Sequence, residues 1–220
     1  QTVARSEPAF RSMVTLTSRP VRSTVAGSAA GVAVRQTQTP FIATSRSAGS
    51  NAARVVQVPN APLSERGRAQ AALLAARLSR LDVAQIVASD YARALDTAEQ
   101  VRAATNAPLE IWPELRERNF GELRGRSYAE IGVDIFAPDF APPGGETWPE
   151  FHARVAHAFE KLRNLAESLA GDLAVISHGL VCRSVVERLV ARPEGVAVPE
   201  VWENTSLTVI GARPPHEIAL

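Results

Sequence analysis

The stretch Asp172-Leu-Ala-Val-Ile-Ser-His-Gly-Leu-Val-Cys-Arg183 decides the fold of this chain. Residues 173–176 form a short apolar run with the length and β-branched content of a buried strand. Ser-His-Gly interrupts the run, and from Leu180 to Val190 apolar residues recur at helical spacing. We therefore expect a strand that ends just before His178 and a helix that begins just after it.

That position gives His178 a possible function. Open α/β sheets bind ligands at the carboxyl ends of their strands. The N–H groups exposed at a helix start favour an anion at the same place. The alternative is that His178 only caps the helix, and both interpretations stay open on this stretch alone.

Composition limits the classes of protein to which the chain can belong. At 220 residues it can form one domain with a sizeable core, and its hydrophobic fraction of 45% is typical of a globular protein. A net charge of +1 gives no bulk attraction to nucleic acid or membrane. No apolar run approaches the length of a membrane span. We expect neither nucleic acid nor a membrane as a partner.

The only cysteine, Cys182, excludes an internal disulfide and suits a reducing compartment such as the cytoplasm. Its apolar neighbours Leu180 and Val181 favour a buried structural thiol over a nucleophile.

The first 38 residues have a different composition from the rest. Five arginines stand against a single acid, Glu7, serine and threonine are frequent, and no apolar period persists. This pattern is typical of a transit peptide, which would direct import into an organelle, or of a disordered tail. A third alternative is a segment that is not the native reading of its gene. We expect residues 1–38 to lack a packed role and the folded domain to span residues 39–220.

Strands and helices are predicted to alternate through the rest of the chain. This alternation predicts a three-layer α/β/α sandwich with a largely parallel sheet. The predicted strands are 40–44, 83–89, 109–112, 173–176 and 206–210, and the predicted helices are one capped by Ser64, then 91–104, 148–169 and 180–190.

Two loops stand out between these elements. Residues 115–125 are expected to form a loop with positive φ at Gly121 and Gly125. Residues 132–145, rich in proline and glycine, are expected to form a surface loop or lid. His152 and His157 are five residues apart on the long helix and do not share a face, so we interpret them as surface histidines rather than metal ligands.

Three polar residues stand at predicted strand or loop ends: Arg93, Glu117 and His178. An arginine fork matches phosphate oxygens, a histidine near a helix start adds a donor, and a carboxyl group can protonate a leaving oxygen. Together they indicate phosphate-ester chemistry. Each also has a structural alternative, since Arg93 could be a solvated helix arginine and Glu117 could form a surface ion pair with a neighbouring arginine.

The order of the motifs resembles the histidine phosphatase superfamily, also called the phosphoglycerate mutase-like family. The resemblance covers the chain from about residue 40 to its end. The matching pieces are Ala61-Pro-Leu-Ser-Glu-Arg-Gly-Arg-Ala-Gln-Ala, Ser89-Asp-Tyr-Ala-Arg-Ala-Leu-Asp-Thr-Ala, Leu115-Arg-Glu-Arg-Asn-Phe-Gly, Gly144-Gly-Glu-Thr, Val175-Ile-Ser-His-Gly and, more weakly, Asn204-Thr-Ser.

The resemblance implies a mechanism that needs no metal or cofactor. In this family one histidine attacks phosphorus, a second histidine and two arginines hold the phosphoryl group, and an acid protonates the leaving alcohol. By motif, Arg93 resembles the second arginine, Glu117 the proton donor and His178 the second histidine. Asn51 resembles the asparagine that closes the first motif, and the amide of Gly179 could add a donor. The implied ligand is a small phosphorylated molecule.

The first motif departs from the family pattern of Arg-His-Gly at a strand end. Anchoring on Asn51 without gaps puts the arginine position at Thr44, the nucleophile position at Ser45 and the glycine position at Arg46. A serine nucleophile would need a nearby base. His178 is the candidate, but the family uses that histidine to hold phosphate.

A shifted alignment makes Arg46 the first arginine, and Ser47 then occupies the nucleophile position. No histidine precedes His152 in the chain, so the nucleophile is absent in either alignment.

Three functions remain for such a chain. The first is a hydrolase of small phosphate monoesters with an altered nucleophile motif. The second is a pseudophosphatase that binds a phosphorylated ligand or partner without turnover. The third is a phosphoglycerate mutase, which the short chain after Phe41 disfavours because the cofactor-dependent mutases carry extra insertions. A plain structural domain without a site is disfavoured by the retained Arg93, Glu117 and His178.

Overall fold

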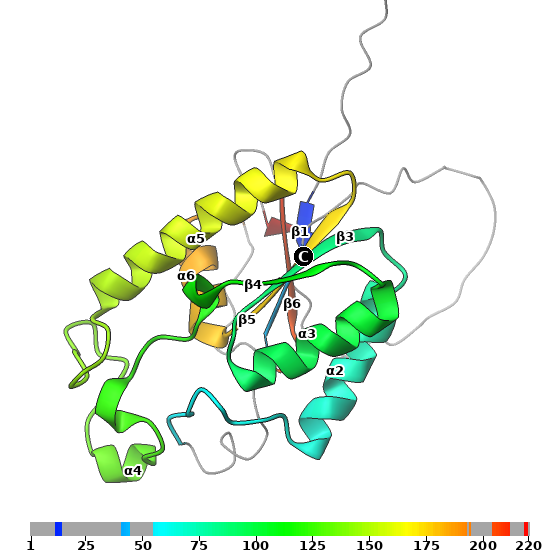
Figure 1. Ribbon diagram of the computed structural model, residues 1–220. Helices are drawn as coiled ribbons and strands as arrows, with labels where there is room; N and C mark the ends of the chain where they lie inside the picture. The colour runs from blue at the N-terminus through cyan, green and yellow to red at the C-terminus, as the bar shows by residue number, and fades with distance from the viewer. Residues whose placement is uncertain are drawn as a thin grey trace, which may run out of the picture.

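The computed structural model describes residues 12–14, 41–44, 55–192, 194, 204–211 and 218–219 (Figure 1). Seven strands form one sheet in the order β1-β7-β6-β2-β5-β3-β4. The strands are β1 (Ser12–Val14), β2 (Phe41–Thr44), β3 (Val83–Ala88), β4 (Leu109–Ile111), β5 (Asp172–Ser177), β6 (Leu207–Gly211) and β7 (Ile218–Ala219).

Five α-helices accompany the sheet within the described residues. They are α2 (Glu65–Leu78), α3 (Ala92–Thr105), α4 (Tyr128–Ile131), α5 (Trp148–Ser168) and α6 (Gly179–Arg188). Two short 3₁₀ turns, η1 (Pro113–Leu115) and η2 (Gly121–Leu123), lie between β4 and α4.

The predicted parallel sheet is found in its four neighbouring strands β2, β5, β3 and β4. The opposite edge is built differently, because β6 runs antiparallel to β2 and β7 runs antiparallel to β6. The parallel strands are the ones after which the predicted site residues follow, so the fold brings those residues to one edge of the sheet.

Helices cover both faces of the sheet, which confirms the three-layer α/β/α architecture. Along β5, Leu173 and Val175 pack with α5 and α6, while Ala174 and Ile176 pack with α2 and α3. This alternation follows from the two-residue period of a strand. Figure 1 shows the two helix pairs on opposite sides of the strands.

Two helix starts show how the sequence fixes element boundaries. The Ser64 side chain accepts a hydrogen bond from Gly67 N, as the predicted N-cap of α2 requires. At α5, Thr147 and Glu150 form a capping box in which each side chain binds the other's backbone N–H. The second cap anchors the loop that enters α5, and that loop carries part of the site.

One strand lies in the segment for which no packed role was predicted. The β1 strand pairs antiparallel with β6, where Val14 faces Val209, and parallel with β7. The prediction missed it because a sheet edge offers backbone groups that even a three-residue strand can pair, without an apolar period in the sequence. The rest of residues 1–38 lies outside the described residues, so the division at 38/39 stays a prediction.

Two further short elements were also not predicted. Strand β7 follows β6, so residues 206–210 are not the last strand, and its two residues are too few to show a period. Helix α4 is a single turn stabilised by a capping box between Ser127 and Glu130. Both depend on contacts made in the folded chain rather than on a sequence pattern.

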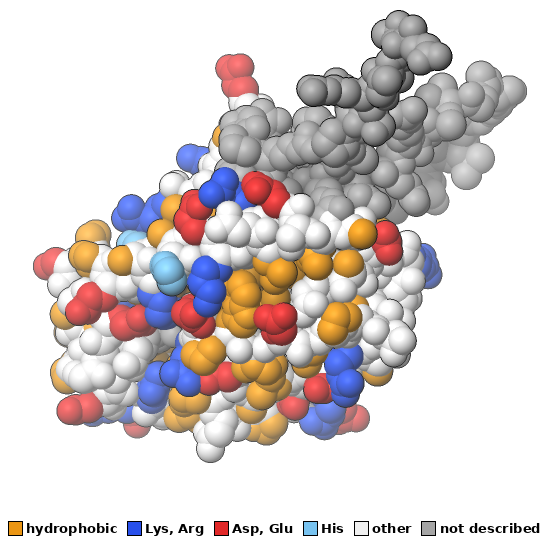
Figure 2. Space-filling model, turned by 45° about the horizontal axis from the view of Figure 1, so that its top comes forward, with side chains coloured by type: hydrophobic (Ala, Val, Ile, Leu, Met, Phe, Trp, Pro, Cys, Tyr) orange, Lys and Arg blue, Asp and Glu red, His pale blue; other side chains and the backbone are white. Residues whose placement is uncertain are grey.

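The surface agrees with the low net charge. Acidic and basic side chains are interspersed over the face seen in Figure 2. Within the described part of the chain, every helix is too short or too polar to cross a membrane.

Candidate active site at the carboxyl edge of the sheet

The four parallel strands end at the same edge of the sheet. Ala88, the last residue of β3, pairs with Ile176 of β5 and with Ile111, the last residue of β4. Thr44, the last residue of β2, pairs with Ser177, the last residue of β5. The predicted site residues follow these strand ends in the sequence. Those predicted after β2 are Ser45, Arg46 and Asn51, and they lie outside the described residues.

His178 follows β5 and is fully enclosed. The residue is 1% exposed, and its Nε2 lies 2.8 Å from Ser89 Oγ. The backbone of His178 occupies the N-cap position of α6, but its side chain forms no capping hydrogen bond. A simple cap therefore does not explain the residue. Ser89 is itself fixed, because its N–H donates to Ile176 O at 2.9 Å.

Tyr91 joins His178 to Arg93. Its ring centroid lies 5.1 Å from that of His178 and 5.1 Å from Cζ of Arg93. Arg93 is 2% exposed and donates to Val58 O at 3.3 Å, so it is not a solvated helix arginine. The structure thus brings Arg93 and His178 against the same aromatic ring.

Tyr91 keeps its proton at neutral pH. Burial raises the pKa of its phenol above the ordinary value, and the nearby guanidinium groups of Arg124, Arg116 and Arg93 only partly oppose this shift. A protonated phenol can donate a hydrogen bond to an anion.

Glu117 reaches the same helix start from the loop after β4. Its Oε2 accepts from Leu180 N, in the first turn of α6, at 3.3 Å, and its Oε1 accepts from Arg118 N at 3.0 Å. A carboxylate is stabilised there by the exposed N–H groups of the helix. Glu117 and His178 therefore lie at the beginning of one helix.

The two arginines that flank Glu117 are directed elsewhere. Arg116 forms a two-point ion pair with Asp90, with Nε 2.8 Å from Oδ1. Arg118 is buried and donates to the carbonyl oxygens of Ile135, Phe140 and Glu146. The side chains of both arginines are thus bonded to groups other than Glu117.

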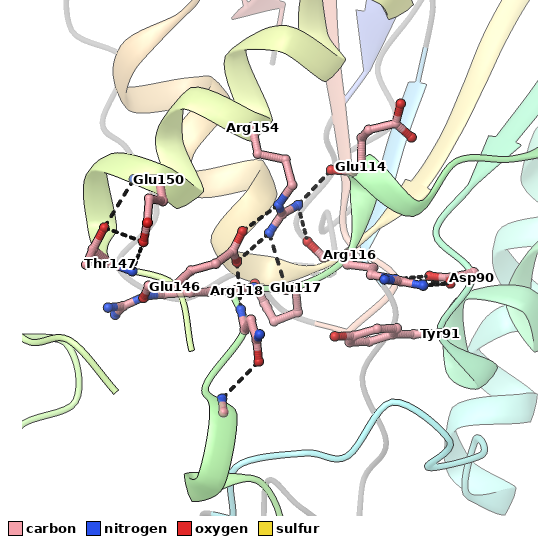
Figure 3. Close-up of polar contacts among 12 residues, drawn as sticks. Asp90, Tyr91, Glu114, Arg116, Glu117, Arg118, Glu146, Thr147, Glu150 and Arg154 are labelled. Carbon is pink, nitrogen blue, oxygen red and sulfur yellow. Dashed lines mark hydrogen bonds and ion pairs between the residues drawn. The ribbon is translucent and has the colours of Figure 1, made fainter. Parts of the chain in front are cut away.

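An ion pair between Arg154 and Glu146 holds the loop that carries Glu117 (Figure 3). Arg154, on α5, donates from Nη1 to Glu114 O at 2.7 Å and to Arg116 O at 3.0 Å. The Glu146 carboxylate also accepts from Asn119 N at 2.8 Å. Both ends of the segment 114–119 are thus fixed to the same charged pair.

The charge on Glu146 is maintained by its partners. Burial alone would raise its pKa, but hydrogen bonds from Arg154 and Asn119 N–H outweigh burial and lower the pKa below the ordinary value. Glu146 therefore stays ionised at neutral pH.

The loop with Glu117 and the loop before α5 cross at very short range. Gly121 has a φ of +53°, and a Cβ there would lie 2.0 Å from Pro143 O. A Cβ on Gly145 would lie 2.3 Å from Asn119 O. The predicted positive φ at Gly121 and Gly125 is confirmed, and at Gly121 the close approach of backbone adds a second requirement for glycine.

Two adjoining cavities open beside Tyr91. The first, of about 310 Å³, borders Glu117, and the second, of about 370 Å³, borders Asp90. Tyr91, Arg116 and Arg124 line both. The first cavity is also lined by Pro113, Glu114, Glu117, Asn119, Glu146 and Arg154.

The cysteine and the other described histidines differ in their burial. Cys182 is buried, and burial raises the pKa of its thiol, in agreement with the predicted structural thiol. His157 is exposed, and His152 is partly buried, stacks on Trp148 and lies 2.8 Å from Ser184 Oγ, so His152 is more enclosed than an ordinary surface histidine. Among the described residues no group of three or more His, Cys, Asp or Glu could hold a metal ion.

Sequence reasoning assigned no role to Ser89, Tyr91, Glu146 or Arg154. Three of them stand inside motifs that were recognised, Ser89-Asp-Tyr and Gly-Gly-Glu-Thr, so their position was available although their contacts were not. No sequence pattern singled out Arg154, because an arginine on the polar side of a long helix is usual.

Comparison with known proteins supports the same family. Residues 44–217 match the family model of the histidine phosphatase superfamily (branch 1). The chain is 33% identical over 167 residues to phosphoglycerate mutase-like protein 4 of Arabidopsis thaliana, covering 67% of each chain.

Solved structures show the same fold. A phosphoglycerate mutase from Bacillus anthracis superposes with a TM-score of 0.70 at 24% identity, covering 83% of this chain and 91% of that one. A mycobacterial glucosyl-3-phosphoglycerate phosphatase, solved with VO3, superposes with a TM-score of 0.67 at 22% identity, covering 79% and 90%.

Proposed function

Because the chain belongs to the histidine phosphatase superfamily, we propose that it binds small phosphorylated metabolites at the start of α6 as a phosphomonoester hydrolase whose nucleophile position is altered. Its relatives include proteins named as phosphatases and as mutases of phosphorylated metabolites. Within that range, the hydrolase assignment and the altered nucleophile are our proposal.

The observation that carries the proposal is the convergence of Arg93, His178 and Glu117. Arg93 and His178 contact one tyrosine ring, and Glu117 accepts from the first turn of the helix that follows His178. The first two would hold phosphate oxygens by charge-assisted hydrogen bonds. Glu117 would protonate the leaving oxygen of the ester.

The alteration of the first motif should affect hydrolysis far more than phosphate binding. Ser45, at the nucleophile position, directly follows the strand end that pairs with Ser177, and the family match begins at residue 44. Without a histidine before His152, the covalent step has no imidazole nucleophile. We therefore expect phosphate binding to survive, through Arg93, His178 and Asn51, while hydrolysis is very slow.

The absence of a histidine at the nucleophile position also favours a second candidate function. This candidate is a binding protein that recognises a phosphorylated ligand without turnover. The two functions differ in a measurable product. Only a chain with a working nucleophile accumulates a covalent phosphoenzyme, which radiolabelled substrate reveals after rapid acid quench.

The test measures binding and turnover separately. Binding of inorganic phosphate and of vanadate is measured by calorimetry, and turnover by hydrolysis of 4-nitrophenyl phosphate. The chain as it stands is compared with Ser45→Ala, with Thr44→Arg/Ser45→His, and with the same pair plus Arg46→Gly. We expect weak binding and almost no turnover in the natural chain, since loss of a covalent nucleophile has cost about a million-fold in a serine protease.

Restored turnover in the rebuilt variants would support the hydrolase. Arg93→Gln added to the rebuilt chain should remove that turnover again, whereas Arg102→Gln on the same helix, in an exposed pair with Glu99, should not. Normal turnover by the natural chain, unchanged in Ser45→Ala, would contradict our assignment of the nucleophile position. Failure of the natural chain to bind phosphate or vanadate would contradict the proposed site.

A further inference from the structure

We infer that Arg124 recognises a second anionic group on the substrate, so that the preferred ligand is a phosphate monoester that also carries a carboxylate or a second phosphate. The inference rests on the proposed function and narrows its substrate class. It is carried by the position of Arg124, by the pairing of the charges around it and by its link to Tyr91.

Arg124 stands where the two cavities meet. It follows the η2 turn, is half-buried, and lines both the cavity beside Glu117 and the adjoining cavity beside Asp90. Its Nη2 donates to the Tyr91 hydroxyl at 2.8 Å, which fixes the guanidinium at the cavity wall. An arginine held in this way loses little side-chain freedom when it binds an anion.

The other arginines that line the cavities already have carboxylate partners. Arg116 is paired with Asp90, and Arg154 with Glu146. Glu114 is paired with Lys161 of α5. In the described ranges, no carboxylate lies within ion-pair distance of Arg124, whose side chain bonds to Tyr91. Arg124 therefore brings a positive charge to the cavity wall that no described carboxylate neutralises.

Tyr91 connects this charge to the phosphate-binding groups. The ring that contacts Arg93 and His178 carries the hydroxyl that accepts from Arg124. That hydroxyl keeps its own proton and can donate to an anion next to Arg124. Figure 3 shows this hydroxyl pointing toward the side on which Glu117 and Glu146 lie.

This geometry sets the shape of the ligand. A phosphate held by Arg93 and His178 and an anion held by Arg124 would be separated by about the length of one tyrosine side chain. A small monoester with a second anionic group a few bonds from its phosphate fits this separation. The planar guanidinium can bind either a carboxylate or a phosphate through two N–H groups.

A merely structural role for Arg124, fixing the loop through Tyr91, makes a different prediction. It would change stability and weaken all phosphate ligands alike. Recognition of a second anion would instead change the ratio between two ligands that differ only in that anion. The ratio is therefore the quantity to measure.

The experiment uses two matched ligand pairs with the full chain. Calorimetry gives the affinities of 3-phosphoglycerate and glycerol 3-phosphate, which differ by a carboxylate, and of fructose 1,6-bisphosphate and fructose 6-phosphate, which differ by a phosphate. Each is measured on the natural chain, Arg124→Gln, Arg124→Lys and Arg126→Gln. The last removes the same charge from an exposed arginine two residues away.

We expect the natural chain to prefer the doubly anionic member of at least one pair by about tenfold or more, the size of one charge-assisted hydrogen bond. The pair that shows the preference identifies the second anion. Arg124→Gln should abolish the preference, Arg124→Lys should retain part of it, and Arg126→Gln should leave it unchanged.

Two other results would overturn the inference, and only the second would also overturn the proposed function. If inorganic phosphate binds but neither pair shows a preference, or if Arg124→Gln and Arg126→Gln behave alike, the inference fails while the proposed function stands. If the natural chain binds neither inorganic phosphate nor any monoester, the proposed function fails and the inference fails with it. Circular dichroism of each variant shows that the ratios compare folded chains.

Discussion

The guanidinium of Arg154 forms a bidentate ion pair with the carboxylate of Glu146, with Nε 2.7 Å from Oε1 and Nη2 2.7 Å from Oε2. Through the carbonyls and the N–H that the two side chains also bind, this pair fixes the backbone on both sides of Glu117. The loop that carries Glu117, the proposed proton donor, thus depends on a contact between residues that lie on different segments of the chain.

Removing the pair should destabilise the fold. Arg154→Gln is expected to lower the free energy of unfolding by about 2–3 kcal/mol, because it leaves partly buried acceptors without charged donors. The measurement is urea unfolding followed by circular dichroism. Arg163→Gln on the same helix breaks only helix-surface pairs with Glu160 and Glu167, and should cost less than about 1 kcal/mol. Equal losses in the two variants would contradict the structural role of Arg154.

The same pair should make stability depend on acid. The pKa of Glu146 in the folded chain lies below the ordinary 4.5, so its stabilisation is fully present above that pH and is lost as the pH falls through the folded pKa. The difference in unfolding free energy between the natural chain and Glu146→Gln should therefore shrink between neutral pH and about pH 3. A difference that stays constant over this range would show that the charge of Glu146 does not matter.

Glu117→Gln should affect esters according to their leaving group. In the rebuilt Thr44→Arg/Ser45→His/Arg46→Gly chain, turnover of an alkyl phosphate should fall by about 10²–10⁴-fold, because the alkoxide leaves poorly without a proton. Turnover of 4-nitrophenyl phosphate should fall much less, since nitrophenolate leaves without help. Glu122→Gln, an exposed acid on the same loop, is the control and should change neither rate. Equal losses for both esters would argue against Glu117 as proton donor.

Two glycines of one loop should respond differently to alanine. At Gly125, with φ +84°, a Cβ would meet only Val58 Cγ1 at 3.8 Å, so the expected cost is about 1 kcal/mol of backbone strain. At Gly121 the added Cβ would also strike the Pro143 carbonyl, and the cost should exceed about 3 kcal/mol. Chemical unfolding of the two variants gives the comparison. A similar cost at both positions would mean that the crossing of the two loops is not tight in solution.

The sequence predicted best those elements whose pattern lies within one short segment of the chain. The apolar run before His178, the cap at Ser64 and the spacing along α5 each predicted an element that the structure confirms. Because parallel strands end at a common edge, the placing of Arg93, Glu117 and His178 after strands or in loops also predicted their approach.

Contacts between distant segments could not be predicted in this way. Arg154 and the carbonyl of Glu114 are 40 residues apart, and neither residue type is unusual for its element. The pairing of β1 and β7 at the sheet edge uses main-chain groups, which every residue carries. The ring of Tyr91 between Arg93 and His178 likewise appears only once α3 and α6 are placed against the sheet.

The crossing of the two loops at Gly121 and Gly145 has a mechanical consequence. Arg118, next to Glu117, is bonded to three carbonyls of the segment that enters α5, and the two backbones touch where a side chain would not fit. The segment that carries the acid Glu117 and the surface loop that enters α5 are therefore held together by direct contacts. If that loop adapts to a substrate, the acid must move with it, so a change in what the protein selects also changes how fast it can react.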